Sequence, residues 1–145
     1  MIKQRNLSNS IVVYLRDKLD VKVDVISDGY EFPRERPLVT VEQMQNNYEY
    51  NVKGREAVEV DYRFQIGLHT EYFRDRQRLQ EYLSDIFIFD RFPYIDFDKS
   101  ADEIVGFFDV DLEAVTPMPS DSKSRHSVKH TVYFDVEINT IKRRR

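Results

Sequence analysis

The amino-acid sequence predicts an α+β fold: a two-layer domain in which a mostly antiparallel sheet of about four strands is covered by two helices. Two segments carry apolar residues at helical spacing, and several others alternate apolar and polar residues as half-buried strands do. The strands form two hairpin-like pairs separated by a helix, which favours antiparallel pairing. The 145 residues suit one domain, and no repeat or linker divides them, so residues 1–145 are predicted to fold as a single unit.

The first helix is predicted over residues 2–19. Leu7, Ile11 and Leu15 recur at a spacing of four residues, which places them on one helix face. Charged residues occupy the other positions, so this helix is expected to lie on the surface of the core with one apolar side buried.

Two strands and a connector are predicted next. Alternating valines predict a short strand over residues 21–25. Residues 31–37 contain two prolines and are expected to form an extended connector, because proline is excluded from helix interiors and central strands. A strand is predicted over residues 38–45, and the polar residues 46–55 are expected to form the open and poorly ordered end of a long hairpin.

The second half of the chain is predicted to contain three strands and a helix. Residues 58–70 alternate most regularly, so one face of that strand is expected to be buried and the other to be wet or covered by a polar partner. An amphipathic helix is predicted over residues 72–89, and alternation predicts one strand over 103–115. The Pro- and Ser-rich residues 116–127 are expected to form a mobile loop, followed by a last strand over 128–141.

One shared core is predicted from these periodicities, because helical spacing and strand alternation select residues that face each other. The residues expected to be buried are Leu7, Ile11, Leu15, Tyr62, Phe64, Ile66, Leu79, Leu83, Ile86, Val132, Phe134 and Val136.

Composition excludes several classes of protein. The chain has no cysteine, so disulfides, thiolate nucleophiles and cysteine-ligated metals are excluded. No apolar stretch has the length of a membrane-spanning helix, and the first residues lack the apolar core of a signal peptide, so no membrane contact is expected. The net charge is −4, and the last four residues are all basic, so the rest of the chain is more acidic still. An acidic body with a basic tip argues against a general nucleic-acid coat and leaves only a local basic contact open.

Two motifs with metal-binding character fail on geometry. His126 and His130 are four residues apart, but they lie where a loop enters a strand rather than on one helix face. The segment Asp96–Asp102 is similar to the start of a calcium loop. However, Ala101 replaces the glycine of the sixth position and Phe107 replaces the glutamate of the twelfth. A solvated acidic loop is therefore the preferred interpretation, and no metal is predicted.

One set of residues has a nuclease-like pattern. Asp109 or Asp111 followed by Asp121 and Lys123 has the order of a metal-dependent nuclease, but that chemistry needs its second acid and lysine on a rigid strand. The four glycines are widely separated, which disfavours a phosphate-binding loop. The sequence therefore predicts neither catalytic residues nor a cofactor, and the chain is interpreted as a protein that is not an enzyme.

Two charged features have no chemical role in this interpretation. Asp109, Asp111 and Glu113 are expected on one strand face, where three carboxylates repel one another. Lys142, Arg143, Arg144 and Arg145 are expected to form a basic tail over residues 141–145. Each feature can simply be solvated, or the two can dock copies of the chain, or a neighbouring protein, by opposite charge.

The order of elements resembles a known family. A short helix, a short strand and a proline-containing connector lead into Arg36–Glu42. A long hairpin ends in Asp61–Ile66, and a helix carries Arg74–Leu79 and Leu83–Ile86 before two late strands. This pattern resembles the tail terminator, or tail completion, proteins of long-tailed bacteriophages, and the resemblance spans most of the chain.

The resemblance implies a homo-hexameric ring in the virion, assembled in the host cytoplasm, that caps the tail tube and joins it to the head-side connector. Its implied partners are its own copies, the tail-tube protein and the connector protein. Contact between DNA and the lumen is left open and is not predicted. With the charged row and the basic tail, Tyr48 and Tyr50 are the expected interface residues. The alternatives are another head–tail joining, neck or head completion protein, or a small cytosolic binding module.

Overall fold

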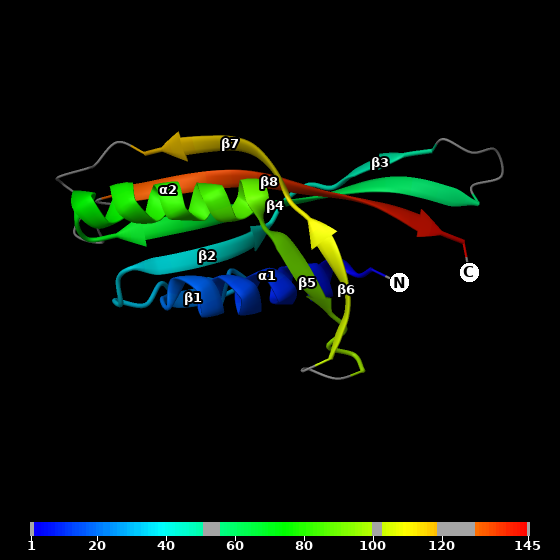
Figure 1. Cartoon of the computed structure of the whole chain (residues 1–145), viewed down its shortest axis with the longest axis horizontal. Helices are drawn as coiled ribbons and strands as arrows, with labels where there is room; N and C mark the ends of the chain where they lie inside the picture. The colour runs from blue at the N-terminus through cyan, green and yellow to red at the C-terminus, as the bar shows by residue number, and fades with distance from the viewer. Residues whose placement is uncertain (1, 51–55, 100–102, 119–129, 145) are drawn as a thin grey trace.

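The computed structural model describes residues 2–50, 56–99, 103–118 and 130–144, and it has an α+β fold with two helices. The elements are α1 (Gln4–Leu19), β1 (Lys22–Val25), β2 (Leu38–Gln43), β3 (Asn47–Glu49), β4 (Ala57–Thr70), α2 (Phe73–Phe89), β5 (Arg91–Ile95), β6 (Ile104–Asp109), β7 (Asp111–Pro117) and β8 (His130–Arg143) (Figure 1).

The main sheet is mostly antiparallel and has six strands, so the prediction of about four strands was wrong. Its order is β1-β2-β4-β8-β7, and β3 pairs with β4 beyond the end of β2. The pair β1–β2 is parallel, which makes the sheet mixed. The sequence could not reveal this pair, because the connector between its strands contains no helix.

The centre of the sheet is the antiparallel pair β4–β8. It runs without a register shift from Ala57 opposite Arg143 to Thr70 opposite His130. Even-numbered residues of both strands face the helices, whereas odd-numbered residues face the other side, here called the outer face. The strict alternation of the two strands is what keeps this register, since a slip by one residue would expose the whole apolar set.

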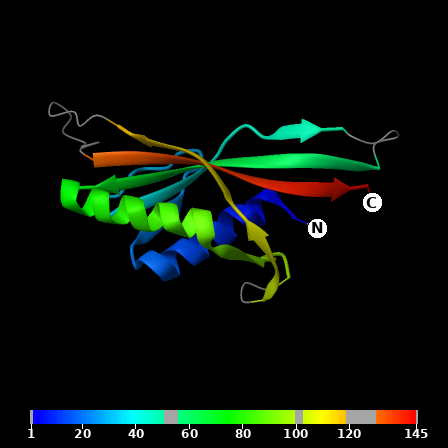
Figure 2. The same ribbon diagram turned by 45° about the horizontal axis from the view of Figure 1, so that its top comes forward.

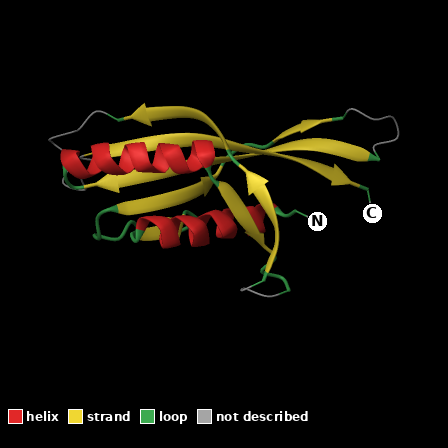
Figure 3. Cartoon of the chain, viewed as in Figure 1, coloured by secondary structure: helices red, strands yellow, loops and turns green. Residues whose placement is uncertain are grey.

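Both helices lie on one face of the sheet (Figures 2 and 3). The buried stripe of α2 packs on β4, β8 and β7, whereas that of α1 packs on β1, β2 and β5. Leu7, Leu83 and Phe134 are fully buried in the core that these elements share. All twelve residues predicted to form the core are buried, which confirms that prediction. One expected member of the second helix stripe, Tyr82, is instead 46% exposed.

A second, two-stranded sheet pairs β5 with β6 and corrects two predictions. The strand expected over residues 103–115 is broken at Val110, where the chain passes from the second sheet into the main sheet. A bulge between Leu112 and Ala114 then reverses the faces, so Ala114 is exposed and Val115 packs against the core. Strand β5 was missed because Pro93 suggested only the end of a helix, although it lies at the second sheet's border.

The proline-containing connector covers part of the outer face, at the end of the sheet opposite to β3. Phe32 packs against His69, which is only 6% exposed. His69 was expected on the wet side of its strand, and it lies on that side. The connector removes water from it, which sequence alternation does not reveal.

At the other end, the sheet forms an arm that reaches beyond both helices (Figures 1 and 2). The arm consists of β3 with residues 57–61 of β4 and 139–143 of β8. The predicted disorder of residues 46–55 was therefore wrong in part, because β3 pairs with β4 and Asn46 bonds to Gln4. Likewise, Pro117 ends β7; residues 51–55 and 119–127 lie outside the described residues.

Candidate protein-interaction surface

The predicted acidic row does not lie on one strand face. Asp109 ends β6 in the second sheet, where its carboxylate lies 3.5 Å from Nε of Arg91. Asp111 begins β7 in the main sheet, and Glu113 lies at the bulge. The buried Val110 separates the two sheets, and this break is why the three carboxylates do not form the row that simple alternation predicts.

Two members of that row belong to a larger group, here called the acidic patch, on the outer face of the main sheet. Asp111 lies directly opposite Glu137 of β8, and Glu137 lies directly opposite Arg63 of β4 on its other side. The register of three neighbouring strands thus collects carboxylates from separate parts of the sequence. The acidic patch consists of Asp61, Asp111, Glu113, Asp135 and Glu137.

Side-chain hydrogen bonds hold the acidic patch in place. The Asn139 amide donates to Asp61 at 2.6 Å and to Glu59 at 2.8 Å. The Gln65 amide donates to Asp135 at 3.3 Å. The partners sit on adjacent strands, so the β4–β8 register fixes the positions of the carboxylates.

Glu137 is the electrostatic centre of the acidic patch. Its side chain is 15% exposed, and its carboxylate lies 3.9 Å from Arg63. Burial, a hydrogen bond with Asp61, and the negative charges of Asp61 and Glu113 raise the pKa of Glu137 to about 7, against the lowering effect of Arg63. The negative charges of the acidic patch are therefore not fully neutralised by the nearby positive charge of Arg63.

This surface can attract cationic groups and repel anions. Phosphate backbones carry a dense negative charge, so the acidic patch is unsuited to nucleic acid and suited to a basic protein surface. Sequence analysis missed Asp61, Asp135 and Glu137 as members. The available signal was the run of polar residues at odd positions of two predicted strands, but only the register shows that these positions adjoin.

The basic residues at the end of the chain are not a simple tail. Lys142 and Arg143 belong to β8 and pair with Val58 and Ala57. The next residue, Arg144, donates its backbone N–H to the Glu56 carbonyl at 2.8 Å and places its guanidinium 3.9 Å from the Glu56 carboxylate. The predicted tail over 141–145 was therefore wrong for residues 141–143, and Arg145 lies outside the described residues.

The two predicted interface tyrosines lie at the arm. Tyr48 is the middle residue of β3 and is 53% exposed, and Tyr50 follows that strand and is 59% exposed. The structure thus brings Tyr48 and the basic strand end Lys142–Arg143 onto one arm. It places the acidic patch closer to the middle of the sheet.

The described residues offer no metal centre. Among them, no group of three or more His, Asp or Glu side chains is arranged to hold a metal ion. In the calcium-like segment, Asp98 instead forms ion pairs with Lys3 and Arg5, and these cations lower the pKa of its carboxyl group. Asp121 and Lys123 of the nuclease-like pattern and His126 lie outside the described residues.

His130, which the sequence places on the apolar face of the last strand, is half-buried there and packs against the ring of Phe73. None of the helices in the described ranges is long and apolar enough to cross a membrane.

No protein family model matches the chain, and no curated protein matches it in sequence.

Proposed function

We propose that this chain is a structural virion protein that forms a ring on the tail tube and joins the tube to the head-side connector, as a tail terminator does. The single observation that carries this proposal is the arm, in which the sheet continues past the helices that cover the rest of it. Such an extension leaves strand edges and apolar side chains such as Ile141 open to contact with another subunit.

Charge supports the same proposal. One chain carries an acidic patch on the sheet and a basic strand end on the arm, and these are two different surfaces of opposite sign. A ring needs heterologous contacts, in which one surface of a subunit meets a different surface of its neighbour. The resemblance of the sequence to tail terminators implies six copies.

The test is to delete the gene for this chain from the phage that encodes it and to examine the particles by electron microscopy. A tail terminator stops tube growth, so we expect unjoined heads together with tubes longer than normal. A neck or head completion protein would leave unjoined tubes of normal length. Normal infectious particles would overturn the proposal and favour a cytosolic binding module.

A matched pair of variants connects the phenotype to the acidic patch. Reversing Asp111 and Glu113 to Lys should impair joining, because both carboxylates are exposed on the outer face or its bulge. Reversing the exposed Glu81 and Asp85 on α2 makes the same change in net charge away from the arm. Those particles should join normally, and circular dichroism should show that both variants fold.

A further inference from the structure

One edge of β8 loses its neighbour where the arm begins. From Val132 to Glu137 this edge pairs with β7. Val110 then directs the preceding chain into the second sheet. In the described part of the chain, no strand pairs with that edge from Ile138 to Arg143, whereas the opposite edge pairs with β4 throughout. This six-residue stretch is here called the open edge.

The direction of the backbone groups follows from two hydrogen bonds. The Arg144 N–H donates to the Glu56 carbonyl beside β4, and the Met118 N–H donates to the Thr131 carbonyl from the β7 side. In an antiparallel pair both backbone groups of a residue point to the same neighbour, and the direction alternates along the strand. Odd-numbered residues of β8 therefore point their N–H and C=O groups away from β4.

The backbone groups of Asn139, Ile141 and Arg143 consequently lie along the open edge. Exposed edges are usually blunted by proline, by bulges or by charged side chains, lysine above all. The open edge has no proline and no bulge, since the β4–β8 register is regular, and its charged residues, Lys142 and Arg143, are confined to its last two positions. By contrast, the far edge of β7 carries a bulge beside Glu113 and ends at Pro117, so it is poorly suited to accept a strand.

Strand β3 forms the opposite edge of the same arm. Asn47 and Glu49 pair with Asp61 and Glu59, whose odd-numbered backbone groups point toward β3. The intervening Tyr48 therefore directs its backbone groups away from β4. Across the described ranges, no other strand pairs with this side of β3.

The two edges of the arm lie level with each other. Glu59 of β4 pairs with Glu49 on one side and with Ile141 on the other. Because β3 and β8 are both antiparallel to β4, they run in the same direction. A neighbouring arm that repeats this orientation would therefore place its β3 parallel to the open edge.

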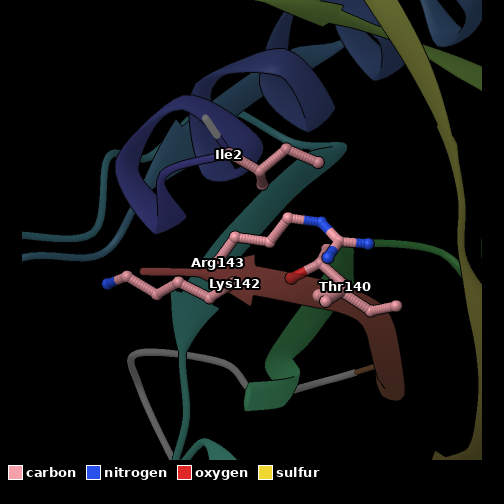
Figure 4. Close-up of a pocket in the computed structure, with 5 residues that line it drawn as sticks. Ile2, Thr140, Lys142 and Arg143 are labelled. Carbon is pink, nitrogen blue, oxygen red and sulfur yellow. The ribbon is translucent and has the colours of Figure 1, made fainter. Parts of the chain in front are cut away.

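A hollow beside the open edge fits the side chain of Tyr48. It has a volume of about 180 Å³ and is lined by Ile2, Thr140, Ile141, Lys142 and Arg143. Figure 4 shows Ile2, from the segment before α1, facing the end of β8 across this hollow. Tyr48 and Thr140 both lie on the inner face of the sheet, because their β4 partner is the same residue, Val60.

We propose that β3 of one copy adds in parallel to the open edge of β8 in the next copy, with Tyr48 of the added strand in the hollow beside Ile2. The inference rests on the proposed function, because it names the contact that closes the ring. Glu49 of the added strand then lies near Lys142 and Arg143, so the charges are complementary. Each copy carries both halves of the contact on opposite edges of one arm, and therefore a second copy is the occupant that fits.

The contact is heterologous, so it repeats from copy to copy until the rotation closes. The main-chain hydrogen bonds of an added strand give affinity, and a pocket for a side chain gives specificity. Tyrosine suits this position because it buries a large area at a small cost in side-chain entropy.

Cysteine cross-linking tests the contact, and the chain has no cysteine of its own. In the double variant Glu49→Cys/Ile141→Cys, both cysteines lie on the outer face, on either side of Glu59. Within one copy they are therefore two strand spacings apart, about 10 Å. That separation is too long for a disulfide, so oxidation can join them only between copies. We expect a ladder of covalent oligomers that ends at the ring.

The control is Glu49→Cys/Thr140→Cys, which moves one cysteine by a single residue to the inner face. It should give no ladder, because adjacent residues of a strand point to opposite faces. Pairing Glu49→Cys with Asn139→Cys or Arg143→Cys covers a register shifted by two residues. A purified chain that stays monomeric by native mass spectrometry, or stops at covalent dimers in all three outer-face pairs, overturns the inference.

A proline variant tests the backbone contribution separately. Ile141→Pro removes an N–H from the open edge, whereas the β4 ladder does not use that N–H. We expect weakened assembly with unchanged circular dichroism. Tyr48→Ala should also weaken assembly, although it leaves the backbone hydrogen bonds of the sheet unchanged. Full assembly by both variants would therefore overturn the inference.

The gene deletion and the cross-links can fail independently. A ladder from a chain whose deletion leaves normal particles would retain the strand addition and reject the proposed function. Unjoined, overlong tubes together with no ladder would retain the function and reject the strand addition.

Discussion

The ring of Phe32 packs edge-on against the imidazole of His69, with 5.3 Å between ring centroids. The imidazole also lies within hydrogen-bond distance of two hydroxyls, 3.1 Å from Thr40 Oγ1 and 3.3 Å from Thr131 Oγ1. Burial, and to a lesser extent the positive charge of Arg36, lowers the pKa of His69 to about 4. A neutral histidine therefore fastens the connector to the outer face.

Stability should fall in acid because of His69. The unfolded chain binds a proton near pH 6.5, whereas the folded chain resists protonation until about pH 4. The unfolded state thus binds more protons in this range, and the free energy of unfolding decreases as the pH falls. The expected loss is on the order of 3 kcal/mol by pH 4.

Urea denaturation at several pH values checks this prediction. Carboxylates also contribute to acid sensitivity, so the informative quantity is the difference between the wild type and His69→Gln. His130→Gln serves as the control and should keep the full pH dependence, since His130 lies on the other face. Equal slopes for the wild type and His69→Gln would contradict the assignment.

Substitution of Gly67 by alanine should destabilise the fold. A Cβ atom at this position would lie 2.5 Å from Thr40 Oγ1 and 2.7 Å from His69 Nε2. Both atoms belong to buried side chains, so overpacking is expected to cost about 1–3 kcal/mol. Gly106→Ala meets no atom within 4 Å and should change the unfolding free energy by less than about 0.5 kcal/mol. Equal thermal unfolding of the two variants would refute the crowding argument.

Truncation of Phe64 should show where the core is. Phe64 is 1% exposed on the inner face of β4, and Phe64→Ala should cost about 3–5 kcal/mol. Phe107→Ala deletes the same atoms from a side chain that is 57% exposed, so its cost should be well below that. Chemical denaturation measures both. If Phe64→Ala lowered the free energy of unfolding by less than about 1 kcal/mol, the assignment of this face of β4 to the core would be wrong.

The ionisation of Glu137 should destabilise the fold as the pH rises. Its pKa is about 7 in the folded chain and 4.5 ordinarily, so the folded state holds a proton that the unfolded state has lost. Stability should therefore decrease between about pH 4.5 and 7, and Glu137→Gln should reduce that decrease. In Glu113→Gln, carbon-13 NMR should show a lower pKa for Glu137, because one repelling charge is gone. An unchanged titration would exclude the influence of Glu113.

The core was predictable because its periodicities are strong. The α1 stripe and the alternation of β4 and β8 each select one buried face, and packing preserved that choice. The break at Val110 was not predictable, because a strand that changes sheets keeps its alternation on both sides. Nor was the acidic patch, since strand order and register decide that Asp111 lies opposite Glu137. Pro93 led to a wrong prediction, because proline suggested that no strand follows the helix. It lies in β5, a strand of the small two-stranded sheet, which tolerates proline.

The late position of β8 in the chain has a consequence during synthesis on the ribosome. Strand β8 lies between β4 and β7, and its nearest bond to β4, from Thr70 Oγ1 to the carbonyl of His130, spans 60 residues. Until β8 emerges, β4 lacks its partner on one edge, and the part of the apolar side of α2 that packs on β8 stays exposed. Contacts so distant in sequence slow folding and favour aggregation of incomplete chains. Chains that stall before β8 should therefore depend on chaperones.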